Sequence, residues 1–230
     1  MDILITSAAA PLAQALASAL QPAHHMRLTD RSFVPNLANF AQSALHHDLS
    51  TNLLVRGLDA IVHVAEPLPS DSEEQQIDYL TRCTYNLCSA AVAEGVRRIV
   101  LLSTLDVMTA YDEQFTVTER WRPKPTAAAP ILAKHLAEFT CREFAREHKL
   151  DVAVLRLGRV VQADEVAGQP FDPLWVAEAD VAQAVERALT ANTGCWGVFH
   201  IGSDAPAARF SVNKAKSGLG YAPVHQFQPG

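Results

Sequence analysis

Histidine and cysteine are the side chains here that most often bind metals, and their spacing argues against a metal site. The nine histidines include the adjacent pairs His24-His25 and His46-His47. Adjacent residues on a strand point to opposite faces and rarely share one ion. The cysteines lack C-x-x-C spacing and are Cys83, Cys88, Cys141 and Cys195. We therefore expect no metal site and no disulfide framework, and interpret the cysteines as small buried hydrophobic residues.

Hydroxyl and amine groups supply the remaining candidates. No G-x-S-x-G sequence is present, so the nucleophile elbow of a serine hydrolase is not predicted. Thr104 ends an apolar run, and Lys134 lies in a later helical stretch with Glu138 four residues on. Taken alone, Thr104 fits a strand-end hydroxyl that bonds the next turn. Lys134 likewise fits a helix residue that pairs with Glu138.

The elements that would position these residues follow from the periodicity of apolar side chains. Short β-branched runs alternate with longer helical stretches, which is typical of a parallel sheet covered on both faces. Strands are predicted at 3–6, 26–29, 60–65, 98–103, 152–157 and 198–201. Helices are predicted at 11–20, 73–94, 133–148 and 179–191. Two further helices are predicted at 36–45 and 50–58, with room for a short strand at 46–48 between them.

Turn-forming residues mark the later connections. Residues 161–175 contain Gly168, Pro170 and Pro173, and we predict a loop there. The chain after Ser203 mixes Pro, Ala and Gly, with a predicted helix at 211–219.

Several segments together resemble one protein family. Residues 100–104 and 133–138 resemble the catalytic half of the short-chain dehydrogenase/reductase superfamily, in its extended, NAD-dependent epimerase/dehydratase-like branch. Residues 84–87, 95–98 and 219–223 are similar to later signatures of the same family. The resemblance implies an α/β fold: a Rossmann-like doubly wound parallel sheet with helices on both faces and a small C-terminal cap. We expect one NAD(P)-binding domain over 1–230, with 161–178 and 203–230 as a reduced substrate-side region.

The first strand-to-helix turn is where such a fold binds the coenzyme pyrophosphate, on backbone N–H groups at a helix N-terminus. Laid on the family's G-x-x-G-x-x-G, the glycines become Ser7, Ala10 and Ala13. Ser7 and Ala10 carry a β-carbon where the turn is tight or the phosphate approaches closely, whereas Ala13 is harmless. Pro11 suits the first helical position, and Leu12 follows it in the expected binding turn.

The resemblance also places residues around the adenosine. Asp30 follows the second strand, where an acid would bond the ribose hydroxyls and favour NAD over NADP, with Arg31 beside it. Alternatively, Asp30 caps a loop and Arg31 is solvated. Asp48-Leu49 resembles the family's Asp-Leu pair beside the adenine, and the strand end at 63–65, which closes with Ala65, resembles its His-Leu-Ala near the cofactor.

Hydride transfer in this superfamily uses a tyrosine hydroxyl as acid/base, a lysine that lowers the tyrosine pKa and holds the ribose, and a Ser or Thr donor to the substrate. By position, Thr104 is the hydroxyl donor and Lys134 the lysine. The tyrosine position of Tyr-x-x-x-Lys is occupied by Pro130, which has neither a hydroxyl nor a titratable atom. Neither Tyr79 nor Tyr111 has the spacing to replace it.

Composition limits the partners. The chain has 230 residues, 49% of them hydrophobic, which suits one sizeable core. Its 19 basic and 25 acidic residues predict no nucleic-acid surface. Because no long apolar run or basic leader is present, we expect a cytoplasmic protein with no membrane partner. The family often pairs through its long helices, so 73–94 and 133–148 suggest a homodimer.

Two functions fit these observations. One is an active NAD-dependent oxidoreductase or epimerase on a sugar, a sugar acid or a nucleotide sugar; the short chain favours a small substrate. The other is a protein that has kept the dinucleotide fold and lost Tyr-Lys hydride transfer, serving as a ligand-binding or regulatory subunit. The departures at Ser7, Ala10 and Pro130 favour the second function.

Overall fold

The centre of the molecule is a parallel sheet of seven strands, in the order β3-β2-β1-β4-β5-β6-β9. The computed structural model describes residues 1–166, 168–204 and 208–227. The sheet strands are β1 (Asp2–Ile5), β2 (His25–Asp30), β3 (Phe40–Gln42), β4 (Ala60–His63), β5 (Arg98–Thr104), β6 (Asp151–Leu157) and β9 (Trp196–Ile201). β1 lies between β2 and β4, and its Ile5 pairs with Leu28 and Val62.

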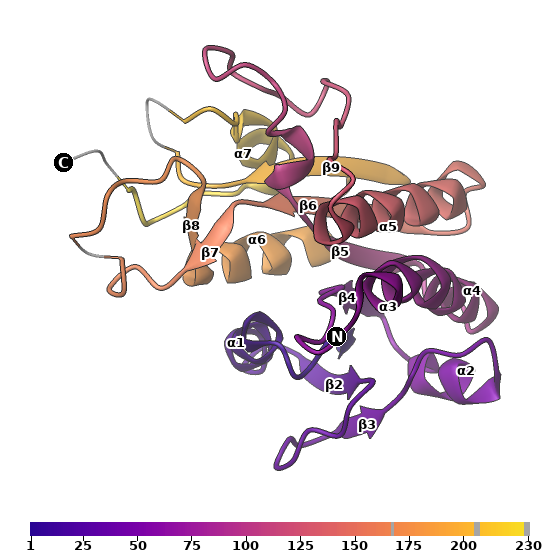
Figure 1. Ribbon diagram of the computed structural model, residues 1–230. Helices are drawn as coiled ribbons and strands as arrows, with labels where there is room; N and C mark the ends of the chain where they lie inside the picture. The colour runs from indigo at the N-terminus through magenta and orange to yellow at the C-terminus, as the bar shows by residue number, and fades with distance from the viewer. Residues whose placement is uncertain (167, 205–207, 228–230) are drawn as a thin grey trace.

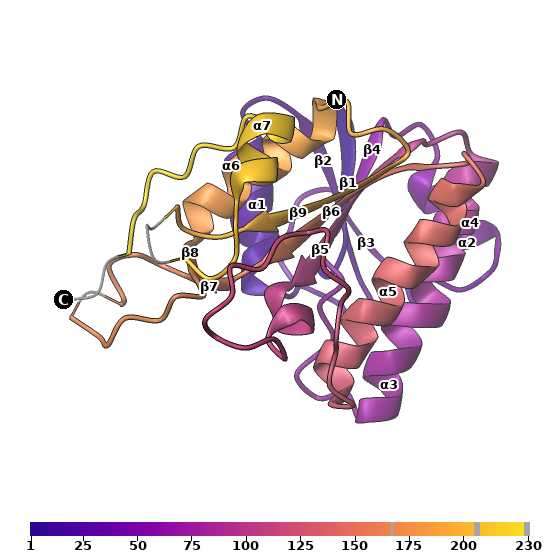
Figure 2. The ribbon, with the colours of Figure 1, turned by 90° about the horizontal axis from the view of Figure 1, so that it is seen from above.

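Helices cover both faces of the sheet (Figures 1 and 2). The helices are α1 (Pro11–Leu20), α2 (Leu49–Val55), α3 (Glu73–Asp78), α4 (Thr84–Ala93), α5 (Ala129–Arg146), α6 (Glu178–Thr190) and α7 (Asn213–Leu219). One core cluster joins α1, α6 and α7 to the sheet, and a second joins α4 and α5 to its other face. This arrangement confirms the predicted Rossmann-like α/β fold.

Small residues let α5 approach the sheet closely. Ala133, Ala137, Cys141 and Ala145 recur every four residues along the helix, and all four are buried. Residues four apart lie on one helix face, so this face presents only short side chains to β5 and β6. The cysteine here packs as a small hydrophobic residue, as the sequence predicts.

The long helix predicted at 73–94 is continuous but irregular. A π-helical turn (Tyr79–Cys83) joins α3 to α4. Such turns insert an extra residue into the helical repeat and occur frequently at functional sites. Here the irregular turn begins at Tyr79, whose ring is buried beside the end of β1.

Two local predictions are wrong. Residues 36–45 are not helical: they contain β3, a three-residue edge strand that pairs with β2. No strand forms at 46–48, because Asp48 is the N-cap of α2. The predicted loop at 161–175 is correct over most of its length, but its ends belong to the two-stranded sheet of β7 (Arg159–Val161) and β8 (Trp175–Ala177).

The structure describes most of the two segments, 161–178 and 203–230, that the sequence predicts as a substrate-side region. Residues 167, 205–207 and 228–230 fall within the segments expected to form that region and lie outside the described residues. The predicted helix at 211–219 is confirmed as α7, which ends at Gly220 in the left-handed conformation. In the described part of the chain, no helix combines the length and apolar character needed to cross a membrane.

Candidate functional site

The order of strands reverses between β1 and β4. In open α/β sheets the carboxyl ends of the strands flank a crevice at such a point, and we call the space between these two strand ends the crevice. Open α/β sheets bind their ligands at this point. One side of the crevice is the turn at 7–10, which leads from β1 into α1. The other side is the connection at 64–72, which leads from β4 into α3.

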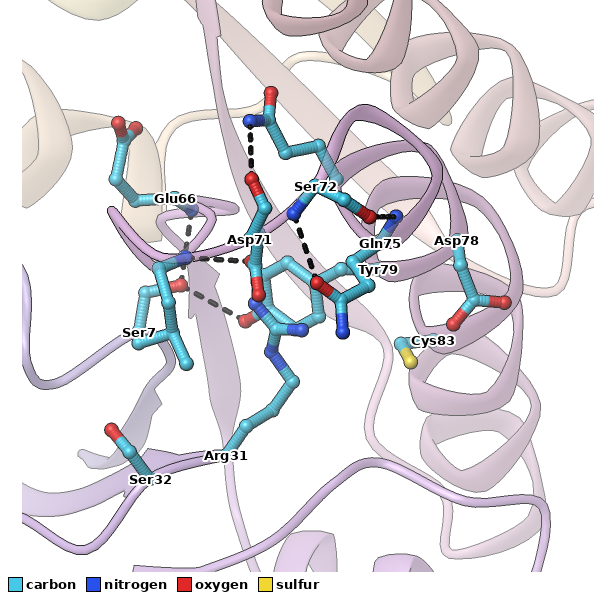
Figure 3. Close-up of polar contacts among 12 residues, drawn as sticks. Ser7, Arg31, Ser32, Glu66, Asp71, Ser72, Gln75, Asp78, Tyr79 and Cys83 are labelled. Atoms are coloured by element: carbon cyan, nitrogen blue, oxygen red, sulfur yellow. Dashed lines mark hydrogen bonds and ion pairs between the residues drawn. The ribbon is translucent and has the colours of Figure 1, made fainter.

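Ser7 joins the two sides of the crevice. Its φ of +56° is the left-handed conformation that glycine adopts without strain, which agrees with its alignment to the family's first glycine. The Ser7 hydroxyl lies 2.9 Å from the Tyr79 hydroxyl and accepts a hydrogen bond of 3.0 Å from the Glu66 N–H (Figure 3). Burial raises the pKa of Tyr79 to about 12. The Tyr79 hydroxyl therefore has a structural role, because it holds Ser7 in place, and it is poorly suited to acid/base catalysis at neutral pH.

Backbone N–H groups of the turn are already bonded to other protein groups. The Ala8 N–H bonds the carbonyl of Thr29, and the Ala10 N–H bonds the carbonyl of Ser7. Pro11 at the start of α1 has no N–H. A pyrophosphate would therefore depend on the next donors of the helix, starting with Leu12, because first-turn N–H groups have no intrahelical partner.

Asp30 holds the turn from the end of β2. One carboxylate oxygen accepts a 2.9 Å bond from the Ala9 N–H, and the other accepts bonds of 2.9 Å from the N–H and the hydroxyl of Ser32. This is the loop-capping arrangement, one of the two alternatives left open by the sequence. A ribose contact by the same carboxylate stays a prediction.

Arg31 crosses the crevice. Its guanidinium lies 4.0 Å from the centre of the Tyr79 ring and forms an ion pair with Asp71, whose carboxylate also accepts a 2.8 Å bond from the Leu68 N–H (Figure 3). The Asp71 side chain is buried in this contact. Arg31 is therefore not the solvated neighbour of Asp30 that one alternative predicted.

A cavity of about 780 Å³ opens beside Arg31. Ala44 and His46, which follow β3, line it together with Asp78 and Arg82 from the α3 side. Asp48-Leu49 does not line this cavity. Asp48 caps α2 by accepting bonds from the Ser50 and Thr51 N–H groups, and Leu49 is 67% exposed.

Lys134 reaches the crevice, but its partners come from the protein. Its ammonium donates to the carbonyls of Val64 (3.0 Å) and Leu102 (3.3 Å) and lies 3.3 Å from the Glu66 carboxylate. Burial lowers the pKa of Lys134, and the nearby Glu66 opposes this shift. The pairing with Glu138 is wrong, because Glu138 is bound elsewhere. Ala65, next to Glu66, is buried with a φ of +55°.

The other two positions of the expected catalytic set, Thr104 and Pro130, are placed as follows. The Thr104 hydroxyl accepts a 3.1 Å bond from the Asp106 N–H and donates to the Asp106 carboxylate, so it caps the short helix Leu105–Met108. Pro130 is exposed in the first turn of α5. Of the other tyrosines, Tyr111 bonds the carbonyl of Arg122, and Tyr85 lies half-exposed on α4.

Sequence reasoning missed Glu66 and Asp71, the two acids that engage the site's cations. Glu66 follows directly after the strand end at 63–65, and Lys134 lies near the start of α5, so both are placed at the carboxyl edge of the sheet. That shared edge was the available signal for Glu66. Over 1–166, 168–204 and 208–227, no three His, Cys, Asp or Glu residues gather where they could hold a metal ion.

Comparison with known proteins identifies the family. A model of the NAD dependent epimerase/dehydratase family matches residues 3–197. The chain belongs to this family. Uronate dehydrogenase from Pseudomonas syringae pv. tomato is 24% identical over 227 residues, covering 96% of this chain and 81% of that protein. L-arabinose 1-dehydrogenase (NAD(P)(+)) from Haloferax volcanii is 26% identical over 161 residues, covering 59% of this chain but 62%, less than two thirds, of that protein.

Solved structures show the same fold. Uronate dehydrogenase from Agrobacterium tumefaciens superposes with a TM-score of 0.85 at 22% identity, covering 98% of this chain and 85% of that one. A tyrosine-to-alanine mutant of that enzyme, complexed with NAD, gives 0.85 at 23% identity with the same coverage. UDP-N-acetylglucosamine 4-epimerase from Bacillus cereus gives 0.81 at 18%, covering 98% and 95%. These likenesses confirm the fold, and the match to the family model confirms the predicted membership of the NAD-dependent epimerase/dehydratase family.

Proposed function

We propose that this family member has lost Tyr-Lys hydride transfer and acts as a ligand-binding or regulatory protein. The observation that carries the proposal is the environment of Lys134. Its ammonium is engaged by two backbone carbonyls and by Glu66, while the position four residues earlier is Pro130. Among the described residues no tyrosine hydroxyl bonds this ammonium, and Pro130 offers no phenol whose pKa the lysine could lower.

Three internal contacts further occupy the crevice. They are the Ser7–Tyr79 hydrogen bond, the Arg31–Asp71 ion pair and the Lys134–Glu66 ion pair. A dinucleotide lying across the carboxyl ends of β1 and β4 would have to displace or rearrange them. We infer that any NAD binding is weak and that the present side chains do not fit the coenzyme as they stand.

The alternative function is an active NAD-dependent oxidoreductase on a small sugar or sugar acid. The observation that favours it is the match to uronate dehydrogenase over nearly the whole chain. The complex of NAD with a tyrosine-to-alanine mutant of the Agrobacterium tumefaciens enzyme also shows that, in that protein, the coenzyme binds without that tyrosine. Binding and turnover must therefore be measured separately.

Removing Glu66 tests the coenzyme proposal. For the wild type we expect a Kd for NAD of about 1 mM or weaker and no NADH formation with uronates or other small sugars. Glu66→Ala is expected to bind NAD about tenfold more tightly, because the ammonium of Lys134 becomes available to another acceptor. Isothermal titration calorimetry with NAD, NADH, NADP and NADPH measures the Kd of the wild type and of the variant, and the near-ultraviolet absorbance of NADH follows its formation.

Glu113→Ala, which removes an exposed loop acid, is the matched control and should leave the Kd unchanged. Micromolar NAD binding with turnover by the wild type would contradict the proposal.

Restoring the phenol tests which group is missing. In a Glu66→Ala background, Pro130→Tyr is expected to give slow but measurable NADH formation, because it places a hydroxyl four residues before Lys134. Pro130→Phe in the same background has the ring without the hydroxyl and should stay inactive. Equal rates for the two variants would exclude the phenol as the missing group. Thermal unfolding of each variant checks the loss of proline from the first helical turn.

A further inference from the structure

A second cavity lies at the edge of the sheet, away from the crevice. It has a volume of about 240 Å³ and is bounded by the segment 119–123, by α5 and by the edge strand β9. Its volume suits a small ligand, below the range of sites for drug-sized molecules. The family's hydride chemistry uses none of the side chains described below.

Arginine gathers around this cavity. Arg120, Arg122 and Arg142 line it and are exposed. Within the described ranges, no carboxylate lies within 4 Å of the guanidinium of Arg120 or Arg122. The Nε of Arg142 lies 3.6 Å from the carboxylate of its chain neighbour Glu143. In the described part of the chain, Arg120 and Arg122 are thus cations without an ion-pair partner, on a protein whose net charge is −6.

The two acids that line the cavity are already engaged. Glu119 accepts a 2.9 Å hydrogen bond from the backbone N–H of His200. Glu138 is bound by the guanidinium of Arg156 at 2.9 and 2.7 Å. Neither carboxylate is therefore placed to neutralise the exposed arginines.

Aromatic side chains form the walls. Trp121, Phe139 and Trp196 line the cavity. The Trp121 ring packs edge-on against Tyr111, at 4.7 Å between centres, and Tyr111 bonds the carbonyl of Arg122 at 2.7 Å. These contacts fix the segment that carries the arginines, so little ordering would be needed on binding.

The wall of this cavity contains a buried polar atom, the Nδ1 of His135. It has no hydrogen-bond partner among the residues that the structure describes. Buried polar atoms are usually hydrogen-bonded, and exceptions call for an explanation such as an absent ligand or water.

We propose that this cavity binds a small organic acid whose carboxylate is carried on a ring. Guanidinium groups bind carboxylates through paired charge-assisted hydrogen bonds, and the aromatic walls suit the face of a ring. Arg120 and Arg122 hold the carboxylate, and Trp121 and Trp196 contact the ring. The mouth is solvent-exposed, so the affinity is modest, with a Kd in the micromolar to millimolar range. The proposal is independent of coenzyme binding.

Tryptophan fluorescence provides the test, because two of the three tryptophans line the cavity. In a Trp175→Phe background the signal comes from Trp121 and Trp196 alone. The probes are benzoate, glucuronate and inorganic phosphate, each titrated to about 10 mM at constant ionic strength. We expect a saturable change with benzoate or glucuronate, confirmed by calorimetry. Arg120→Gln with Arg122→Gln should weaken binding at least tenfold, since each removes a charge-assisted bond.

Arg97→Gln is the matched control. Arg97 is also exposed and only loosely paired, 3.8 Å from Asp151, and this change should leave the Kd unaltered. No saturable response to benzoate or glucuronate, a response to phosphate alone, or equal weakening by the control and the double variant would each overturn the proposal. Circular dichroism of each variant confirms that the fold is retained.

Discussion

Replacing Arg156 by methionine is expected to lower the free energy of unfolding by about 3–5 kcal/mol, because it leaves a buried carboxylate without its counter-charge. The side chains of Arg156 and Glu138 are 4% and 5% exposed, and two hydrogen bonds of 2.9 and 2.7 Å join them. The Ser103 hydroxyl donates a further bond of 2.6 Å to Glu138. Urea unfolding at pH 7 measures the loss.

The double variant Arg156→Met with Glu138→Leu separates the cost of an orphaned charge from the net worth of the pair. Replacing both partners by apolar residues of similar size is often neutral or stabilising. We therefore expect the double variant to recover most of the stability lost in the single variant. Arg97→Met, at an exposed position, should change stability by less than about 0.5 kcal/mol. Equal losses in the single and double variants would contradict this account.

Acidification below pH 6.5 is expected to destabilise the protein before most carboxylates titrate. Burial lowers the pKa of His63 to about 3, helped by the charge of Lys134, and lowers that of His200 to about 3, helped by Arg156. In the unfolded chain both titrate near 6.5. Between pH 6.5 and 3 the unfolded state therefore binds more protons, so stability is present above 6.5 and is lost as the pH falls. The expected loss is about 2 kcal/mol per histidine by pH 5.

Urea midpoints measured between pH 7 and pH 5 test this expectation. His200 is fully buried, and neither ring nitrogen has a hydrogen-bond partner among the described residues. His200→Leu should therefore remove about half of the pH dependence without an intrinsic loss of stability. His25→Gln, at an exposed position on β2, should keep the wild-type dependence. A pH profile unchanged by His200→Leu would show that this histidine is not responsible.

The sheet and its main helices could be predicted because their signals are local. Continuous apolar runs mark buried parallel strands, and apolar residues at three- and four-residue intervals mark α1, α5 and α6. The edge strand β3 could not be found in this way. It has three residues, none of them buried, and exists because Leu28 and its neighbours in β2 offer a pairing edge. Only the assembled sheet contains that information.

In the candidate site, too, features with a local sequence signal could be predicted, and contacts between distant residues could not. The positive φ of Ser7 follows from its alignment with a glycine, and the cap at Thr104 follows from its place at a strand end. The Lys134–Glu66 and Arg31–Asp71 pairs join residues far apart in the chain. Nothing in local periodicity selects these partners, because they meet only where the carboxyl ends of different strands are brought to one edge.

The run of alanines and one cysteine along the inner face of α5 fixes how deeply the ammonium of Lys134 can penetrate. Since Ala133 immediately precedes the lysine and is fully buried, the backbone of the helix itself sits close to the strands. The ammonium of Lys134 therefore bonds the carbonyls of Val64 and Leu102 from a side chain that is itself mostly buried. The two hydrogen bonds to these carbonyls thus depend on how closely the helix packs on the sheet. They should persist whichever anion replaces Glu66 at the exposed side of the ammonium.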